Sequence, residues 1–393
     1  MNEDIVWPLM SNNISRFDLD NLIEFLKQEN PKLTHGPKVI EFEELWSNWL
    51  GVSNSCMVNS GSSANDITMM ALKEMYGEGE VIVPALTWVS DIASVLNAGL
   101  RPVVVDINRR SLGAEKSAVL RAISKDTRAV FLTHILGFDA LDDEVIEELR
   151  VRNIPLIEDV CESHGAMHKD RKLGAIGYAS NFSFYYAHHM STIEGGMISS
   201  NDEEFVDICR MMRSHGLVRE SRNAAKRKVI IENHPDLNPE FVFQYASHNM
   251  RPTEINGVLG INQLKRLDEN VKKRNHNFEA FLEVLDPELF QTEFQVEGMS
   301  NYALTLILKK SDFSLRDAIE SRFKKSRIEF RRGLSGGGNQ LRQPYFIQRV
   351  GSLDLKNFPN VEHVHNFGWY LGNYPDMPRS NLSLLSDVLN GLI

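Results

Sequence analysis

Between residues 50 and 200 the sequence alternates short apolar, β-branched runs with segments of helical period. The runs predict strands at residues 81–85, 102–107, 129–133, 155–158, 181–184 and 197–199. Several are uninterrupted apolar stretches, as strands buried on both faces of a sheet require. Segments such as 65–75 and 142–152 repeat apolar residues at the spacing of a helix with one buried face. The alternation therefore predicts an α/β fold with a mostly parallel sheet.

The rest of the chain divides into a connector and a smaller unit. A helix is expected at 202–213, after which regular periodicity stops from 217 to 247. That stretch is rich in Arg and Lys, and it is either a solvated loop or a cationic arm that reaches a phosphate. One long helix is expected from 254 to 285. Strands at 302–308 and 327–331, a helix at 314–325, a Gly-rich loop at 333–338 and a helix ending near 390 follow. We expect a large domain over 1–265 and a small α/β domain over 266–393.

Charge and cysteine content exclude several classes of protein. The chain has 53 acidic and 43 basic residues, a formal charge of −10, which argues against nucleic-acid binding. Cys56, Cys161 and Cys209 are too few for a four-thiolate cluster and lie too far apart for a CxxC motif, so neither a disulfide framework nor a metal site is expected. No signal peptide and no apolar run near the roughly 20 residues of a membrane helix is found, so we expect a cytoplasmic protein without membrane contact.

Two segments carry polar residues where open α/β sheets bind ligands. Small and hydroxyl residues at 59–65 directly precede a helical period, and the N–H groups of a helix start bind anions. Ser-rich turns that merely cap helices are the alternative. At 157–166 an apolar strand runs into Glu158, Asp159 and Glu162. A carboxylate at that strand end can keep a heterocyclic nitrogen protonated, although acids that cap a following helix would give the same pattern.

The segment 183–196 is the most specific. Ser183-Phe184 and Glu194-Gly195-Gly196 resemble the flanks of the cofactor lysine in the DegT/DnrJ/EryC1/StrS sugar aminotransferases. Counting from either flank reaches His188, and no lysine occurs between Lys172 and Lys226. The lysine that would bind the cofactor covalently is therefore replaced by histidine. The same His-His run is typical of the lysine-lacking sugar 3-dehydratases of this family.

The resemblance covers almost the whole chain, in segments 7–9, 34–36, 60–65, 84–88, 158–166, 215–216, 249–252 and 260–265. It implies an aspartate-aminotransferase-like fold (fold type I) with a seven-stranded sheet, and a homodimer with composite active sites. The implied cofactor is pyridoxal 5′-phosphate, alternating with pyridoxamine 5′-phosphate. The positions that match the family's cofactor contacts are Ser60, Gly61, Ser62, Ser63, Trp88, Asp159, Glu162, Ser183 and, from the partner subunit, Asn249.

Histidine can move protons but cannot hold the cofactor covalently. With the aminated cofactor on a 4-keto sugar, loss of the C3 hydroxyl then replaces simple transamination. We therefore expect a nucleotide-sugar 3-dehydratase of dideoxysugar biosynthesis, with His188 as the base in preference to His189 and L-glutamate as the amino donor. The alternatives are an aminotransferase that uses another base and an inactive binder of sugar nucleotides.

The nucleotide is less strongly determined. Residues 342–345 resemble the CDP-linked 3-dehydratases, but those enzymes carry an iron–sulfur cluster on cysteines that this chain lacks. We therefore expect a GDP-linked 4-keto-6-deoxymannose substrate, with a CDP-linked 4-keto-6-deoxyglucose substrate as the alternative. Arg331, Arg332 and Arg342 are candidates for its diphosphate because guanidinium groups bind phosphates in bidentate geometry. The further candidates for substrate binding are His215, Arg219 and Arg251.

Overall fold

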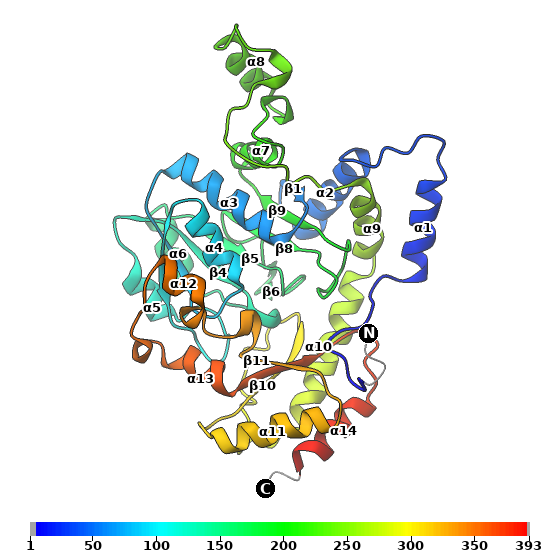
Figure 1. Cartoon of the computed structure of the whole chain (residues 1–393), viewed down its shortest axis with the longest axis vertical. Coiled ribbons are helices and arrows are strands. Elements are labelled where there is room, and N and C mark those ends of the chain that lie inside the picture. Colours follow the sequence, from blue (N-terminus) through cyan, green and yellow to red (C-terminus); the bar gives the residue numbers. More distant parts are fainter. Residues whose placement is uncertain (1–4, 391–393) are drawn as a thin grey trace.

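The computed structural model describes residues 5–390 and contains a seven-stranded sheet with a three-stranded sheet beneath it (Figure 1). The order in the large sheet is β1-β9-β8-β5-β4-β2-β3. Neighbouring strands from β8 to β3 are parallel, whereas β9 is antiparallel to both β1 and β8. The α/β fold with a mostly parallel, seven-stranded sheet is thus confirmed. Its strands are β1 (Asn54–Val58), β2 (Glu80–Pro84), β3 (Arg101–Val105), β4 (Thr127–Thr133), β5 (Leu156–Asp159), β8 (Ala179–Ser183) and β9 (Gly196–Ser200).

Helices cover both faces of this sheet, because alternate side chains of the strands point to opposite faces. On β4, Phe131 packs in one apolar cluster with α3 (Gly61–Tyr76) and α4 (Val89–Asn97). Its neighbour Val130 packs in the other cluster, with α2 (Pro37–Leu50), α5 (Lys116–Ala122) and α6 (Asp143–Val151). The carboxyl ends of the parallel strands all open toward the small sheet.

The small sheet has the order β10-β12-β11 and is antiparallel. Its strands are β10 (Ala303–Ile307), β11 (Phe330–Arg332) and β12 (Gly368–Gly372). The helices of this part are α11 (Phe313–Lys325), α12 (Pro344–Arg349), α13 (Pro359–Phe367) and α14 (Ser380–Asn390). A two-stranded hairpin, β6 (Met167–His168) with β7 (Arg171–Lys172), completes the strands of the described residues.

The single long helix expected from 254 to 285 is wrong, since two helices occupy the segment, α9 (Glu254–Leu264) and α10 (Leu267–Glu283). The chain leaves helical geometry at Arg266, whose φ is −117° and ψ 4°. The Arg266 guanidinium binds the buried carboxylate of Asp18, at 2.8 Å and 2.5 Å. Because Asp18 is so distant in sequence, the helical periodicity around Arg266 does not reveal the break between the two helices.

Residues 213–251, here called the arm, follow α7 (Glu203–Met212), and the middle of the arm stands away from the body at the top of Figure 1. Its two ends pack on the body, where Arg213 pairs with Glu43 at 2.6 Å and the Met250 carbonyl accepts from the Asn59 N–H at 3.0 Å. The expectation of no regular structure is wrong for part of the arm, because α8 spans Ala224–Glu232. Asn223 caps this helix by accepting from the Lys226 N–H at 3.0 Å. None of its side chains is buried, so the helix lacks the apolar stripe by which sequence periodicity is recognised.

The N-terminal segment that precedes α1 (Arg16–Leu26) packs against the small sheet. Trp7 is fully buried, and its indole Nε1 donates to the Gly372 carbonyl at 3.1 Å. The Trp7 carbonyl accepts from the Glu329 N–H at 2.9 Å. Further on, the Asn13 amide donates to the His188 carbonyl at 3.1 Å. This segment therefore ties the small sheet to the loop that carries His188. Within residues 5–390, no helix has the length and apolar character needed to cross a membrane.

Candidate active site

A cavity of about 520 Å³ lies between the carboxyl ends of the large sheet and the small sheet. Its floor comes from strand ends and helix starts of the large sheet, and its roof comes from β10, β11, β12 and the loop after β11. The floor residues that line it are Ser60, Gly61, Ser62, Trp88, Ser90, Thr133, Asp159, Cys161, Glu162, Ser183, Tyr185, Ala187, His188 and Glu194. The remaining lining residues are Leu9, Met10, Tyr302, Ala303, Glu329, Arg331, Ser335, Tyr370 and Asn373.

An anion site is formed where α3 begins. Ser60 is the N-cap residue, and its hydroxyl accepts from the Ser63 N–H at 3.1 Å. Gly61 follows because a Cβ there would lie 2.6 Å from the Cβ of Ser183, so no side chain fits between the helix and β8. Ser63 is turned away and donates to Asn59 at 2.6 Å. The exposed N–H groups and the Ser60 and Ser62 side chains thus face the cavity with the positive end of the helix dipole.

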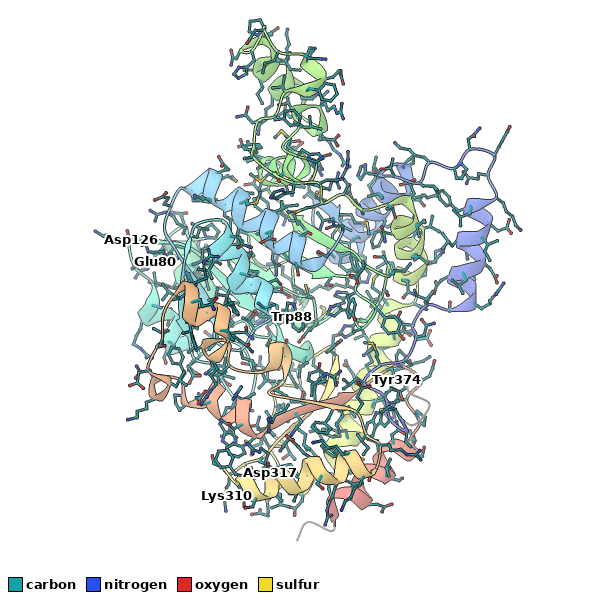
Figure 2. The ribbon with its side chains drawn as sticks, viewed as in Figure 1. Glu80, Trp88, Asp126, Lys310, Asp317 and Tyr374 are labelled. Carbon is teal, nitrogen blue, oxygen red and sulfur yellow. The ribbon has the colours of Figure 1, made fainter. Side chains whose placement is uncertain are left out.

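Asp159 ends β5 at the cavity floor and is 3% exposed. Its Oδ1 accepts from the Cys161 N–H at 2.9 Å and its Oδ2 from the Asn65 amide at 3.1 Å. Both oxygens are thereby fixed in direction. Trp88, which lies near the middle of the molecule in Figure 2, caps α4 and is half exposed at the cavity wall. A fixed carboxylate and an accessible indole face suit a flat, cationic ring between them.

His188 lies in the loop from β8 to β9 and lines the cavity. Its ring packs against Tyr302, with 5.5 Å between centroids, and against His164 and Tyr185 at 6.1 Å each. Burial, with a smaller contribution from the Arg274 guanidinium, lowers the pKa of His188 to about 3. The imidazole is therefore neutral at pH 7.

His189 is placed differently, although it is the next residue. It is 1% exposed and does not line the cavity. Its Nε2 lies 3.0 Å from both the carbonyl and the hydroxyl of Ser300, on the far side of the loop. Burial and the charge of Arg274 lower the pKa of His189 as well. The two histidines thus separate into one that faces the cavity and one that anchors the loop.

Glu162 joins floor and roof. Its Oε2 accepts from the Leu136 N–H at 3.0 Å, and its Oε1 lies 2.7 Å from the Ser335 hydroxyl. Burial raises the pKa of Glu162 to about 7, against the lowering effect of these two hydrogen bonds. The contact with Ser335 depends on a constrained loop, because Leu334 has φ 63° and ψ −146°, a region that residues with a Cβ rarely occupy.

The three arginines considered for a diphosphate are not brought together. Arg331 lines the cavity and lies 3.2 Å from Glu329. Arg332 pairs with Glu320 at 3.3 Å outside the cavity. Arg342 holds Glu362 in a bidentate pair at 2.8 Å and 2.6 Å, also outside it. Each of the three arginines is thus paired with a carboxylate of the chain itself, and only Arg331 among them lines the cavity.

The four candidates on the arm, His215, Arg219, Asn249 and Arg251, do not line the cavity of their own chain. The Asn249 side chain accepts from Arg251 Nε at 3.0 Å. Arg219 lies 3.8 Å from Glu240 on the arm itself. His215, Asn249 and Arg251 lie at the base of the arm, where the Met250 carbonyl accepts from the Asn59 N–H at 3.0 Å, but their side chains do not line the cavity of the same chain.

Several cavity residues were missed by sequence reasoning. Tyr302, Glu329, Tyr370 and Asn373 come from the small sheet and its edges. No local motif marks them, since they enter the cavity only through the docking of two sheets. Tyr185 was within the motif that contains His188, and its position beside the histidine was the available signal. Among the described residues, no group of three or more His, Cys, Asp and Glu side chains is arranged to hold a metal ion.

Comparison with known proteins gives relatives over nearly the full length. GDP-4-keto-6-deoxy-D-mannose 3-dehydratase of Escherichia coli O55:H7 is 29% identical over 369 residues, which are 92% of this chain and 94% of the relative. A crystal structure of GDP-4-keto-6-deoxymannose-3-dehydratase, a histidine-to-asparagine mutant with bound GDP-perosamine, superposes with a TM-score of 0.87 at 28% identity, covering 98% of this chain and 100% of that one. The same protein with a trapped PLP-glutamate geminal diamine gives 0.86 at 28% identity, with the same coverage.

The model of the DegT/DnrJ/EryC1/StrS aminotransferase family matches residues 13–388. This range contains the anion site, Asp159, His188 and both sheets. The family resemblance drawn from the motifs is thus confirmed over residues 13–388. The chain belongs to the DegT/DnrJ/EryC1/StrS aminotransferase family.

Proposed function

We propose that this chain removes the C3 hydroxyl of a GDP-linked 4-keto-6-deoxy sugar, using pyridoxal phosphate that cycles through its aminated form. The observation that carries the proposal is a neutral histidine, and no lysine, lining a cavity that otherwise has the residues of a cofactor site. Relatives of nearly equal length with the dehydratase name support the substrate class. The structures with GDP-perosamine and with a PLP–glutamate adduct support the nucleotide and the amino donor.

The residues present fit the cofactor. Its phosphate would lie at the start of α3, where Gly61 leaves no room for a side chain and Ser60 and Ser62 present donors. Trp88 would stack on the ring, and Asp159 would hold the ring nitrogen in its protonated state. Glu162 and Ser183 would lie along the ring edge and near the phosphate. When bound, the cofactor supplies an electron sink next to C4 of the sugar.

His188 would do the proton work. As a neutral imidazole it would take the proton from C4′ of the aminated cofactor, and as an imidazolium it would hand that proton to the hydroxyl leaving sugar C3. The low pKa of His188 favours the second transfer, because a weak base releases its proton readily. His188 cannot form the covalent link that a lysine would, so nothing on the cavity wall captures the cofactor between turnovers.

The overall reaction balances with L-glutamate as reductant. Glutamate and the 4-keto sugar give 2-oxoglutarate, ammonia and the 3-deoxy-4-keto sugar, so the oxygen lost from C3 is formally the oxygen gained by the keto acid. One equivalent of each product is expected. No further electron donor is needed for this balance.

We also propose that two copies of the chain complete each other's sites. Asn249, His215, Arg219 and Arg251 belong to the arm, and the cavity of the same chain lacks them. Arg331 is the one diphosphate candidate that already lines the cavity. In a dimer the arm of one subunit would bring its cations to the nucleotide, and the amide of Asn249 to the cofactor, of the other.

The test is a substrate comparison with purified protein. GDP-, CDP- and dTDP-linked 4-keto-6-deoxy sugars are each supplied with pyridoxal phosphate and glutamate, and the deoxy sugar, ammonia and 2-oxoglutarate are quantified. Equal amounts of all three from the GDP sugar support the proposal. A 4-amino sugar without ammonia would show an aminotransferase instead, and a preference for the CDP sugar would overturn the nucleotide assignment.

A further inference from the structure

A buried carboxyl group lies directly behind the cavity floor. Asp91 belongs to the first turn of α4 and is fully buried. It does not line the cavity, although its neighbours Ser90 and Thr133 do. None of the ion pairs among residues 5–390 includes Asp91. A buried carboxylate without a cation is costly, so its protonation state has to be inferred from its contacts.

Three oxygens form a closed triangle at this point. The Oδ2 of Asp91 contacts the hydroxyl of Thr87 and, at 2.6 Å, the hydroxyl of Thr133. The two hydroxyls lie 2.6 Å from each other. Each of the three contacts needs a hydrogen, but the threonines supply two. A proton on Asp91 supplies the third, and each oxygen then donates once and accepts once around the triangle.

The other oxygen of Asp91 is tied to the cavity floor through Asn65. The Asn65 amide donates to Asp91 Oδ1 at 2.7 Å and to Asp159 Oδ2 at 3.1 Å. It also lies 3.1 Å from the Ser90 hydroxyl. One amide nitrogen thus spans two acidic side chains. The hydrogen bond from Asn65 to Asp159 therefore depends on Asp91, which positions the Asn65 amide.

The surroundings favour one negative charge on this pair of acids. The titratable groups facing Asp91 are Asp159, the Cys161 thiol and the Tyr345 phenol, none of which is a cation. Burial first, and then the nearby Asp159 carboxylate, raise the pKa of Asp91 well above its usual range. The triangle of oxygens and this environment therefore point to the same protonation state.

We propose that Asp91 is a positioning residue that stays protonated at neutral pH, so that the pair it forms with Asp159 carries a single negative charge, on the carboxylate that faces the cavity. Asp91 then holds Asn65, and Asn65 holds Asp159 toward the ring nitrogen of the cofactor. The protonation is a property of the folded chain alone. Its effect on the cofactor rests on the function proposed above.

Infrared difference spectroscopy of the cofactor-free protein at pH 7 tests the proton. The wild-type minus Asp91→Asn spectrum should contain the carbonyl band of a protonated carboxylic acid, moving to lower frequency in D₂O. Asp207→Asn is the control, because Asp207 is equally buried and accepts one hydroxyl and one N–H on separate oxygens, at 2.6 Å each. Its difference spectrum should show carboxylate bands only. The proposal fails if Asp91→Asn shows carboxylate bands alone or if Asp207→Asn gives the same acid band.

A second variant guards against misfolding of Asp91→Asn. Thr133→Val keeps the shape of the side chain and removes one hydroxyl of the triangle, so the acid band should shift without disappearing. An unshifted band would contradict the assignment to Asp91.

Binding of pyridoxal phosphate, followed by quenching of tryptophan fluorescence, tests the positioning role. Asp91→Asn keeps the charge of the pair and an acceptor for Asn65, so its affinity should stay within about twofold, whereas Asp91→Ala should lose about tenfold with the loss of one buried hydrogen bond. An asparagine variant as weak as the alanine variant would overturn the role. Absence of binding to the wild type would refute the proposed cofactor site and leave the infrared result standing.

Discussion

The cavity floor and the arm differ in how their residues are held. On the floor, Asp159 and Glu162 have both carboxylate oxygens in hydrogen bonds from groups of the same chain, and Ser60 is fixed as a helix cap. On the arm, no side chain of α8 is buried, and Phe241 and Phe243 are each 56% exposed. The floor is finished within one chain, whereas the arm exposes apolar and cationic side chains that the same chain does not cover.

This difference separates the proposed tasks. Groups that must meet a small ring at fixed distances lie where backbone and side chains restrain them on every side. Groups proposed for the larger nucleotide lie on a segment whose position a second subunit would determine. A floor variant should therefore inactivate the site of its own chain. The activity lost in an arm variant should be restored by a partner subunit whose arm is intact.

The largest effect is expected at His188. His188→Asn removes the proposed base and should lower turnover by about 10² to 10⁴, or roughly 3 to 5 kcal/mol of barrier, with cofactor affinity nearly unchanged. His189→Asn should cost far less, because that ring binds Ser300 and does not reach the cavity. Turnover and cofactor binding are measured separately for both variants. Full activity in His188→Asn would remove the base from the proposal.

The junction of floor and roof should show in stability. The pKa of Glu162 is raised to about 7 in the folded chain, so the folded state keeps a proton that the unfolded chain releases above about pH 4. The stability contributed by this group is therefore full at low pH and is lost as the pH rises from about 4 to about 7. Glu162→Gln does not titrate, and its amide still reaches Ser335.

Denaturant unfolding of the cofactor-free protein measures this effect at one fixed concentration. The stability of Glu162→Gln relative to wild type should be larger at pH 8 than at pH 4, by about 3 kcal/mol. A difference that stays constant with pH would show that folding does not raise the pKa of Glu162.

Mixing variants tests whether the arm acts on another copy. Asn249→Ala should lower turnover by about 10- to 100-fold as the loss of one or two polar contacts to bound groups. Co-expressed with His188→Asn, it should restore activity, because about half of the dimers then pair one intact floor with one intact arm, giving about a quarter of the sites in a two-fold dimer. The control is co-expression of His188→Asn with a second floor variant, Asp159→Asn. Both residues line the cavity of their own chain, so each site of a mixed dimer still lacks one of them and no recovery is expected. Activity that recovers in the control but not in the mixture with Asn249→Ala would contradict the proposal that Asn249 contributes to the site of the partner subunit.

The smallest effects should separate the arginines. Arg331→Ala should raise the KM for the nucleotide sugar by about tenfold through loss of one charge-assisted contact. Arg342→Ala should leave KM unchanged and reduce stability by less than about 1 kcal/mol, since its pair with Glu362 is partly exposed. Steady-state kinetics at saturating glutamate measures both. A higher KM in Arg342→Ala alone would indicate that the Glu362 pair opens to bind substrate.

The floor was largely predictable from sequence. Strand ends and helix starts are local patterns that pointed to Ser60, Asp159 and Glu162, whereas the family resemblance, with its missing lysine, identified Trp88 and His188. All five line the cavity. The six strands expected between residues 81 and 199 are present with small shifts of their ends, and β1 was the strand missed in the large sheet. Apolar runs at parallel strand positions make such elements visible one at a time.

The roof and the arm were not predictable to the same degree. Which arginine faces the cavity depends on competing carboxylates, Glu320 and Glu362, that come from other helices. The break at Arg266 depends on Asp18, nearly 250 positions earlier. Long-range pairings of this kind leave no periodic trace. The division into domains at residues 265 and 266 stays a proposal, although it coincides with the break between α9 and α10.

The buried Trp7 constrains the order in which the protein can be completed during synthesis. Its indole binds Gly372, 365 positions later, and Leu9 and Met10 beside it line the cavity. Trp7 leaves the ribosome 365 residues before Gly372, so its docking surface is incomplete until β12 is made. Until then a large apolar side chain stays exposed on the nascent chain, where chaperones bind such groups. Closure of the cavity by Leu9 and Met10 therefore has to follow the translation of β12.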